Sequence, residues 1–247
     1  MPMIGTRKLY HLLKPQLTQL NIGRDKLFRI LKANRLLIKQ KRSYHITTDS
    51  HHRFRKHKNL VNILEIERPE QVWVSDITYT GNRKNPSYLA LITDAYSKKI
   101  VGYNVSDSLN AYGSIRALEM AVKNRKDKTK PLIHHSDRGL QYCSDDYQKT
   151  LKTNNIKPSM TEQYDPYENA IAERINGILK QEFSIAKYDV DLVIKTNLIS
   201  NAIKIYNTKR PHLSNHMLTP NQMHQQNKLK RKTYKSKNLN NSTIVQV

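Results

Sequence analysis

The sequence predicts an α/β fold, with a mixed sheet flanked by helices, preceded by a small all-helical module. Between residues 69 and 225, three short runs of β-forming residues come first, and helical and strand patterns then alternate. Residues 1–39 instead show two short helical patterns in a strongly basic stretch. A chain of 247 residues has room for one core domain and one smaller module.

Charge and composition mark the expected domain boundaries. The first 68 residues contain sixteen Lys and Arg against four acidic residues. We expect a helix-turn-helix-like DNA-binding module at 1–39, a basic linker at 40–68, the core domain at 69–225, and a basic, flexible, phosphate-contacting tail at 226–247.

The basic module is expected to contain two helices. The first pattern runs from Ile4 to Lys14, and Gly23 opens the second. In a helix-turn-helix module the second helix enters the major groove, so we expect Arg24, Lys26 and Arg29 to contact DNA. Any small helical hairpin gives the same periodicity, and the pattern alone does not separate the two.

The core is expected to begin with three strands joined by turns at Gly81-Asn82 and Ser97-Lys98. A helix and a strand then follow, and the pair is repeated before a final long helix. The expected elements are strands Val72–Thr80, Tyr88–Thr93 and Lys99–Val105, helix Ala111–Lys123, strand Leu132–His134, helix Tyr147–Thr153, strand Ile156–Ser159 and helix Asn169–Ser184.

An acidic residue, Asp76, lies in the middle of the first expected strand. Alternation places Val74, Asp76 and Thr78 on one side of the sheet, and Trp73 and Ile77 on the other. Asp has a poor strand propensity, and its carboxylate is costly to bury without a partner, so a divalent cation is a physical reason for it. An Asp that faces solvent on an edge strand is the alternative.

Two further acidic residues stand where a site is expected. Asp137 follows the fourth strand, and α/β sheets often place site residues at such strand ends. A turn-forming Asp before Gly139 explains it equally well. On the last helix Glu173 shares a polar face with Asn169 and Asn176, although a solvated helix face gives the same pattern.

Composition favours a nucleic-acid partner. The formal net charge is +23 and the isoelectric point is about 10.0, as is typical of a protein that binds a polyanion. No long apolar run or signal-peptide pattern supports a membrane partner. A ribosome-associated basic protein remains compatible with the charge, but it does not account for the three acidic residues.

The single cysteine, Cys143, cannot form an intramolecular disulfide, which suits a reducing cytoplasm. His51, His52 and His57 lie close together in the sequence. A structural zinc site built on these histidines would also need two cysteines, so we expect no structural zinc here. We interpret these histidines as part of the basic linker.

Five motifs occur in the order found in one family of mobile-element enzymes. They are WVSDITYT, TDAYSKKIVGY, HHSDRGLQY, YENAIAERINGILKQEF, and YNTKRPH before LTP. With these motifs the chain resembles an insertion-sequence transposase with a retroviral-integrase-type DDE core, in particular the second-frame (OrfB) products of the IS-three family. The order of elements likewise resembles the ribonuclease H-like fold. The resemblance covers nearly the whole chain and includes a helix-turn-helix-like module at its start.

The resemblance implies the roles of several residues. Asp76, Asp137 and Glu173 would be the catalytic ligands of two Mg²⁺ ions, with Mn²⁺ as a substitute, and no organic cofactor is expected. Asp94 would be an acidic residue of the second strand that is not a ligand. The residues expected to contact DNA, besides those of the basic module, are Lys180, Asn169, Asn176, Arg210 and His212.

The implied reaction cuts the ends of an insertion element and joins the exposed 3′-hydroxyl to another phosphodiester. The implied partners are DNA, further copies of the chain and the first-frame (OrfA) protein, in the bacterial cytoplasm at the nucleoid, with no membrane. We also hypothesise that Tyr164 and Tyr167 stack at the flipped element end, although they could equally cap the sheet edge. A plain nuclease and a non-enzymatic DNA-binding remnant are the alternatives.

Overall fold

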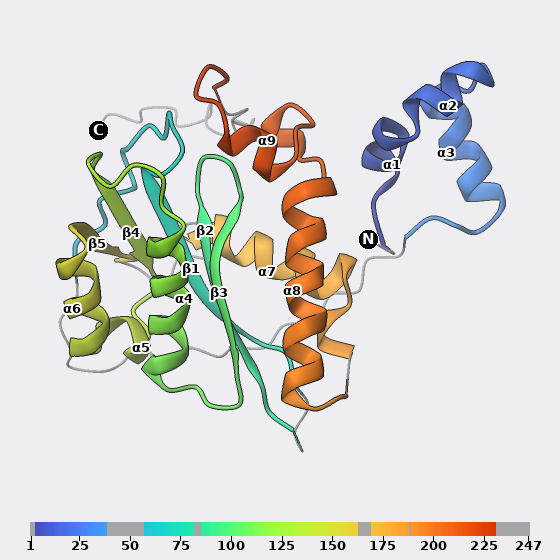
Figure 1. Ribbon diagram of the computed structural model, residues 1–247. Coiled ribbons are helices and arrows are strands. Elements are labelled where there is room, and N and C mark those ends of the chain that lie inside the picture. The colour runs from blue at the N-terminus through green and yellow to red at the C-terminus, as the bar shows by residue number, and fades with distance from the viewer. Residues whose placement is uncertain (1–2, 39–56, 82–84, 163–168, 188, 231–247) are drawn as a thin grey trace, which may run out of the picture.

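A five-stranded mixed sheet forms the centre of the core (Figure 1). The computed structural model describes residues 3–38, 57–81, 85–162, 169–187 and 189–230. The strands lie in the order β3-β2-β1-β4-β5, with β2 antiparallel to both β1 and β3, and β4 parallel to both β1 and β5. Their bounds are β1 Val72–Tyr79, β2 Tyr88–Asp94, β3 Ile100–Ser106, β4 Leu132–Ser136 and β5 Ile156–Met160. The predicted mixed sheet is confirmed, with strand ends shifted by one or two residues.

Helices cover both faces of this sheet (Figure 1). On one face lie α4 (Ala111–Lys123), α5 (Leu140–Cys143) and α6 (Asp145–Thr153). On the other lie α7 (Ala170–Glu182), α8 (Leu192–Lys209) and α9 (Pro220–His224). The sequence analysis did not place α5, α8 or α9. Short 3-10 turns occur at Ile185–Lys187 and Leu213–Asn215.

The alternation expected in β1 is confirmed. Trp73 and Ile77 pack in the hydrophobic cluster that contains the buried residues of α4 and α6. Val72 and Val74 pack on the opposite side, in a cluster with Ala172 of α7. Asp76, which is even-numbered like the two valines, therefore lies on the side of the sheet covered by α7.

Helix α4 lies directly on the backbone of β3. A Cβ atom at Gly102 would be 2.1 Å from the backbone oxygen of Ala117, so only a residue without a side chain allows this approach. At the start of α4, the Asn110 side chain accepts a hydrogen bond of 3.1 Å from the backbone N–H of Tyr112. Leu109, just before this cap, lies beside the candidate site.

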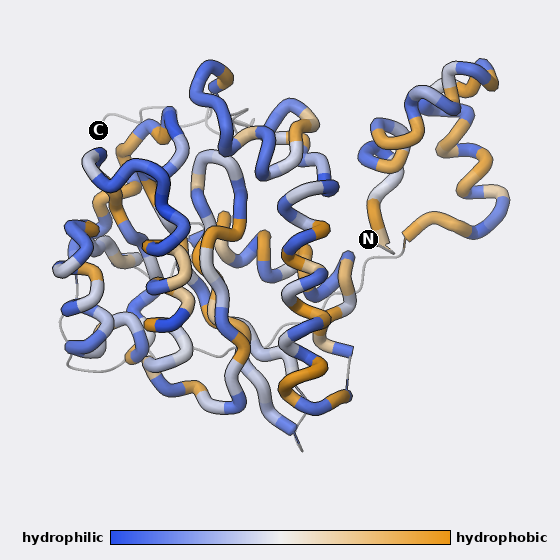
Figure 2. The backbone as a smooth tube through the Cα atoms, viewed as in Figure 1, coloured by the Kyte–Doolittle hydropathy of each residue, from blue (hydrophilic) through white to orange (hydrophobic). Residues whose placement is uncertain are grey.

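The N-terminal module contains three helices rather than the two that were predicted. They are α1 (Thr6–Leu12), α2 (Lys14–Gln19) and α3 (Arg24–Ala33). The first predicted helix ends early because Pro15 lacks an amide hydrogen and its ring would clash with the carbonyl group four residues earlier. In the described part of the module, Leu17 and Leu27 are the buried hydrophobic side chains. Figure 2 shows further hydrophobic residues along α3 and in the segment after it.

The structure moves two of the expected domain boundaries. Residues 57–68 were predicted to be a linker, yet Ile66 is buried against the core, and the backbone N–H of Leu60 donates to Ser159 Oγ at 2.9 Å. At the other end, the Tyr96 hydroxyl donates to the backbone oxygen of Leu229 at 2.6 Å, within the predicted tail. Residues 57–68 and the start of the predicted tail therefore pack on the core.

The remainder of the predicted linker, with His51 and His52, and most of the predicted tail lie outside the described residues. None of the helices in the described ranges combines the length and the apolar character needed to cross a membrane.

Candidate active site

Strands β1 and β4 separate at the candidate site. Their parallel pairing ends at Val74 and His135, whereas β1 stays paired with β2 up to Tyr79. Asp76 and Asp137 each follow their strand's last paired residue by two positions, so they lie level with each other where the strands diverge. This register explains why two carboxylates 61 positions apart in the sequence meet at one edge of the parallel pair.

The Asp76 carboxylate is half-buried and is held by two donors. Its Oδ1 accepts a hydrogen bond of 2.9 Å from the backbone N–H of Ile77, and its Oδ2 accepts one of 2.6 Å from Asn176 Nδ2 on α7. Asp137 lies in the turn between β4 and α5, where its Oδ1 accepts a bond of 3.1 Å from the backbone N–H of Gly139. The Asp76 carboxylate keeps an acceptor position for a further ligand.

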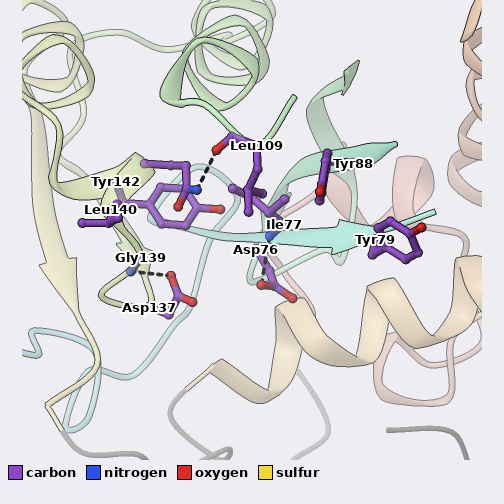
Figure 3. A pocket seen from close by; sticks show the side chains of 10 residues that line it. Asp76, Ile77, Tyr79, Tyr88, Leu109, Asp137, Gly139, Leu140 and Tyr142 are labelled. Atoms are coloured by element: carbon purple, nitrogen blue, oxygen red, sulfur yellow. Dashed lines mark hydrogen bonds between the residues drawn. The ribbon is translucent and has the colours of Figure 1, made fainter. Parts of the chain in front are cut away.

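Asp76 and Asp137 border one cavity of about 110 Å³. Figure 3 shows their carboxylates directed toward the same region, between β1 and the turn that leads into α5. The remaining walls are largely apolar and aromatic, and Gln141 Nε2 closes one side by donating to the backbone oxygen of Leu109 at 2.7 Å. The lining residues are Asp76, Ile77, Tyr79, Tyr88, Leu109, Asp137, Gly139, Leu140, Gln141 and Tyr142.

Without a bound cation, the ionised form of the Asp76 carboxylate is disfavoured. Burial and the nearby charge of Asp137 raise the pKa of Asp76 to about 7, and the charge of Glu173 adds to the shift, against the hydrogen bonds from Asn176 and Ile77. Two carboxylates this close disfavour joint ionisation, and a divalent cation removes that penalty. The donor set, carboxylate oxygens alone, fits a hard cation such as Mg²⁺.

Glu173 lies in the first turn of α7, as an exposed residue whose carboxylate has its pKa raised by desolvation. It does not line the cavity of Asp76 and Asp137. In the described ranges no three His, Cys, Asp or Glu side chains lie close enough together to hold a metal ion. The structure thus brings two of the three predicted ligands together and places the third on the helix that contacts Asp76.

Asn169 and Asn176, which we predicted to contact DNA, are only 7% and 5% exposed. Asn169 Nδ2 donates to the backbone oxygen of Ser75 at 3.0 Å, next to the bond that Asn176 makes with Asp76. Both amides therefore join α7 to β1 and do not face solvent. The sequence placed them on the face of Glu173 but did not show that β1 covers that face.

Lys180 and Gly177 lie further along α7. Lys180 is half-buried, and burial lowers its pKa, while the charge of Asp76 acts in the opposite direction. A Cβ atom at Gly177 would meet no atom within 4 Å. Space beside α7 at this point is open to a substrate.

Arg210 and His212, also predicted to contact DNA, lie inside the core and are 1% and 7% exposed. The Arg210 guanidinium binds both carboxylate oxygens of Glu182, at 2.7 and 2.6 Å, and its third nitrogen lies 2.9 Å from His212 Nε2. These contacts use the guanidinium inside the fold, so the DNA-contact prediction is corrected to a structural role.

The other predicted residues have simpler outcomes. Arg24, Lys26 and Arg29 are exposed on α3, where Arg24 also pairs with Asp25. His57 contacts Gln148 of α6 at 2.9 Å.

Buried side chains account for two more residues. Cys143 is buried in the core. Asp94 is fully buried and accepts bonds from Ser97 and from the backbone N–H of Glu70, so it has a structural role beside the strand end. Tyr164 and Tyr167 lie outside the described residues.

Comparisons with known proteins identify the family of the chain. A family model described as an integrase core domain matches residues 66–166, and a second model with that description matches 154–220. The chain is 38% identical over 196 residues to an uncharacterized 31 kDa protein of insertion element IS600 from Shigella sonnei, covering 77% of this chain and 71% of the relative.

Proteins named as transposases are also similar. The identity is 35% over 160 residues to transposase InsF for insertion sequence IS3A of Escherichia coli, covering 64% of this chain and 55% of the relative. It is 36% over 118 residues to a putative transposase for element IS986/IS6110 of Mycobacterium tuberculosis, covering 46% and 42%. The chain thus spans about half the length of these two relatives.

Two solved structures show the same fold. The catalytic core domain of HTLV-2 integrase, determined in complex with magnesium, has a TM-score of 0.51 at 22% identity, covering 64% of this chain and 97% of that one. A simian T-cell lymphotropic virus intasome bound to a PP2A regulatory subunit has a TM-score of 0.56 at 20% identity, covering 97% and 81%. The expected ribonuclease H-like, integrase-type fold is therefore confirmed.

Proposed function

The chain belongs to the insertion-sequence transposases with an integrase-type catalytic core, and we propose that its Asp76, Asp137 and Glu173 hold the divalent metal ions for this polynucleotidyl transfer. The observation that carries the proposal is the meeting of Asp76 and Asp137 in one cavity, with the pKa of Asp76 raised by burial and by its neighbour. Groups with strongly shifted pKa values gather at functional sites.

Glu173 completes the proposed ligand set from α7. Its charge already acts on Asp76, and Asn176, one turn further along the same helix, binds the Asp76 carboxylate directly. In this proposal the exposed Glu173 side chain joins the two aspartates when the metal ions bind. We infer two Mg²⁺ ions, with Mn²⁺ as a substitute. When bound, two such ions activate an attacking oxygen and stabilise the leaving oxygen of a phosphodiester.

The protein's own residues have distinct tasks in this reaction. Asn176 holds one oxygen of Asp76 and leaves the other side of the carboxylate facing the cavity. The half-buried Lys180 supplies positive charge beside the site for a DNA phosphate. The exposed Arg24, Lys26 and Arg29 of α3 supply affinity for the duplex, independently of the chemistry.

The substrates are the ends of an insertion element and a target DNA. The reaction cuts an element end, and the 3′-hydroxyl that this exposes attacks another phosphodiester in line. We infer that the active form on DNA is an oligomer, that the first-frame (OrfA) protein is a partner, and that the protein acts at the nucleoid of a bacterial cell. The likeness to a chain taken from an intasome supports assembly on DNA.

The test is a cleavage and joining assay on labelled element-end DNA with Mg²⁺ or Mn²⁺. The wild-type protein should give metal-dependent joined products, which Asp76→Asn and Glu173→Gln should abolish. Glu119→Gln, a change at an exposed acidic residue of α4, is the matched control and should retain activity. All four proteins should bind DNA alike, because the charge of the basic module is unchanged.

Two outcomes of this assay would count against the proposal. Joined products from Asp76→Asn would contradict the assignment of the metal ligands. If the wild-type protein binds DNA without forming products, the assay is repeated with the first-frame protein added, and failure there too would reject the enzyme in favour of a DNA-binding remnant.

Replacing Arg24, Lys26 and Arg29 together by Gln tests the proposed DNA-binding role of α3. The measurement is the affinity for the same labelled DNA at several salt concentrations. We expect weaker binding and a shallower dependence of affinity on salt, by about 0.9 in the logarithmic slope for each phosphate that the variant no longer neutralises. Equal binding by the variant and the wild-type protein would remove α3 from the DNA interface.

A further inference from the structure

The Tyr142 hydroxyl is a buried polar group that the fold does not use. The residue is 2% exposed, and within the described ranges its hydroxyl has no hydrogen-bond partner. A buried donor without a partner costs folding free energy, so its presence calls for a physical reason.

Neighbouring aromatic residues fix the position of the ring. Tyr142 packs edge-on against Tyr147, with ring centroids 5.3 Å apart and an interplanar angle of 80°, and it lies 6.1 Å from the His134 ring. The polar atoms of these neighbours are bonded to one another: His134 Nε2 lies 2.8 Å from the Tyr147 hydroxyl and 2.6 Å from Ser75 Oγ. The ring is therefore held in place without any partner for its own hydroxyl.

Tyr142 is one of the residues that line the cavity of Asp76 and Asp137, and its hydroxyl is buried behind that wall. Figure 3 shows the Tyr142 ring beside the Asp137 turn, with its oxygen directed toward β1. Burial, followed by the charges of Asp137, Tyr147 and Asp76, raises the pKa of Tyr142 well above its usual value, so the group stays protonated and able to donate. It lies near two carboxylates, yet it is bonded to neither of them.

We propose that the Tyr142 hydroxyl donates a hydrogen bond to an oxygen that enters this cavity during the reaction, and so positions that oxygen between Asp76 and Asp137. The oxygen belongs to a water or to a DNA phosphate. At about 110 Å³ the cavity holds more than one water-sized group. The inference rests on the proposed function, because it assigns Tyr142 as a positioning residue for the same site.

The test compares Tyr142→Phe, which removes only the hydroxyl, with Tyr147→Phe, a neighbouring tyrosine whose hydroxyl is bonded inside the protein. Thermal unfolding is measured first. Tyr142→Phe should unfold at or above the wild-type temperature, whereas Tyr147→Phe should unfold at a lower one. A lower unfolding temperature for Tyr142→Phe would overturn the proposal, because it would reveal a partner for the hydroxyl inside the protein.

Calorimetric titration with Mn²⁺ alone then identifies the oxygen. Loss of one hydrogen bond to a water of the loaded site should weaken Mn²⁺ binding by about two- to tenfold in Tyr142→Phe, and Tyr147→Phe should bind Mn²⁺ as the wild type does. If Mn²⁺ binding is unchanged but single-turnover cleavage at saturating DNA falls by a similar factor, the oxygen belongs to a phosphate. If neither quantity changes, the proposal is wrong.

The Asp76→Asn variant separates this inference from the proposed function. It should lose Mn²⁺ binding in the same titration. If Asp76→Asn binds Mn²⁺ normally, the metal site itself is misplaced, whatever Tyr142→Phe shows. If Asp76→Asn loses Mn²⁺ binding while Tyr142→Phe matches the wild type in every measurement, the metal site is supported and only the proposed role of Tyr142 is wrong.

Discussion

The N-terminal module and the core stabilise their folds in different ways. The core encloses hydrophobic clusters on both faces of its sheet, with fully buried residues such as Trp73 and Leu118. The described part of the module buries only Leu17 and Leu27 among its hydrophobic side chains, and leaves Leu20 and Leu36 each 65% exposed. Most of the stability therefore lies in the core, whereas the module leaves apolar surface exposed.

An ion cluster links these two regions. Glu182 at the end of α7 is bound by Arg210 from inside the core and, at 3.3 Å, by Lys8 of α1. Burial acts to raise the pKa of Glu182, but the hydrogen bonds and charges of Arg210 and Lys8 together hold that pKa below its usual range. One carboxylate thus stabilises the core through one partner and contacts the module through the other.

The largest effect is expected for Arg210→Met. This change removes the guanidinium that donates to both oxygens of the buried Glu182 carboxylate. Removal of one member of a buried ion pair lowers the free energy of unfolding by about 3–5 kcal/mol. Chemical denaturation should show the loss in the core transition. Arg116→Met on α4 is the control, since Arg116 is bonded to Tyr112 at the surface. A loss below about 1 kcal/mol would show that Arg210 does not stabilise the core.

Asp76→Asn should change stability in the opposite direction. The pKa of Asp76 is raised to about 7 in the folded state, so without metal its ionisation progressively destabilises the core as pH rises from about 4 to 7. At pH 7.5 the metal-free variant should be more stable than the wild type by about 1–4 kcal/mol, and at pH 4 the two should be equal.

Thermal unfolding at both pH values, with and without Mg²⁺, measures this difference. Added Mg²⁺ should stabilise the wild-type protein at pH 7.5 but leave the variant unchanged. The prediction fails if the wild type and the variant have the same dependence of unfolding temperature on pH.

Leu27→Ala should unfold the module and leave the core intact. The side chain is one of the two buried hydrophobic side chains described in the module, and truncation of a buried Leu costs about 2–5 kcal/mol where the site is tightly packed. Hydrogen exchange should become fast in α1 to α3 and stay slow in β1 and β2. Loss of protection in the strands as well would show that the two regions fold as one unit.

The smallest effect is expected for Lys8→Met. Because Arg210 alone satisfies both oxygens of Glu182, removal of the second cation at the edge of the cluster should cost about 1 kcal/mol or less. Burial, followed by the charge of Arg210, lowers the pKa of Lys8, which further limits what its charge contributes. Limited proteolysis of the module should accelerate more than global unfolding, and an equal change in both would contradict the distinction.

Local patterns in the sequence predicted the elements whose signals are local. Alternation and turn residues placed β1, β2 and β3 to within two residues, and helical spacing gave α4 its observed ends. Helix α8 was missed because its hydrophobic residues are distributed around the helix, as Leu192 and Val193 are exposed while Ile199 and Ile203 are buried.

The sequence singled out the acidic residues of the candidate site but not their surroundings. Asp76 stood out because an acidic residue interrupts a β-forming run. The role of Asn176 depends on α7 lying across β1, and the buried pairing of Arg210 depends on Glu182, which is 28 residues away. Contacts between segments that are far apart in the sequence do not affect the local periodicity. Asn176 and Arg210 were therefore predicted to contact DNA.

Gly102 shows how a position outside the candidate site can set the shape of that site. Any side chain there would push α4 off β3, and the segment just before α4 supplies Leu109 to the wall of the cavity beside Asp76. A side chain at position 102 would therefore reshape the cavity beside Asp76 through helix packing alone, without a change to any acidic residue.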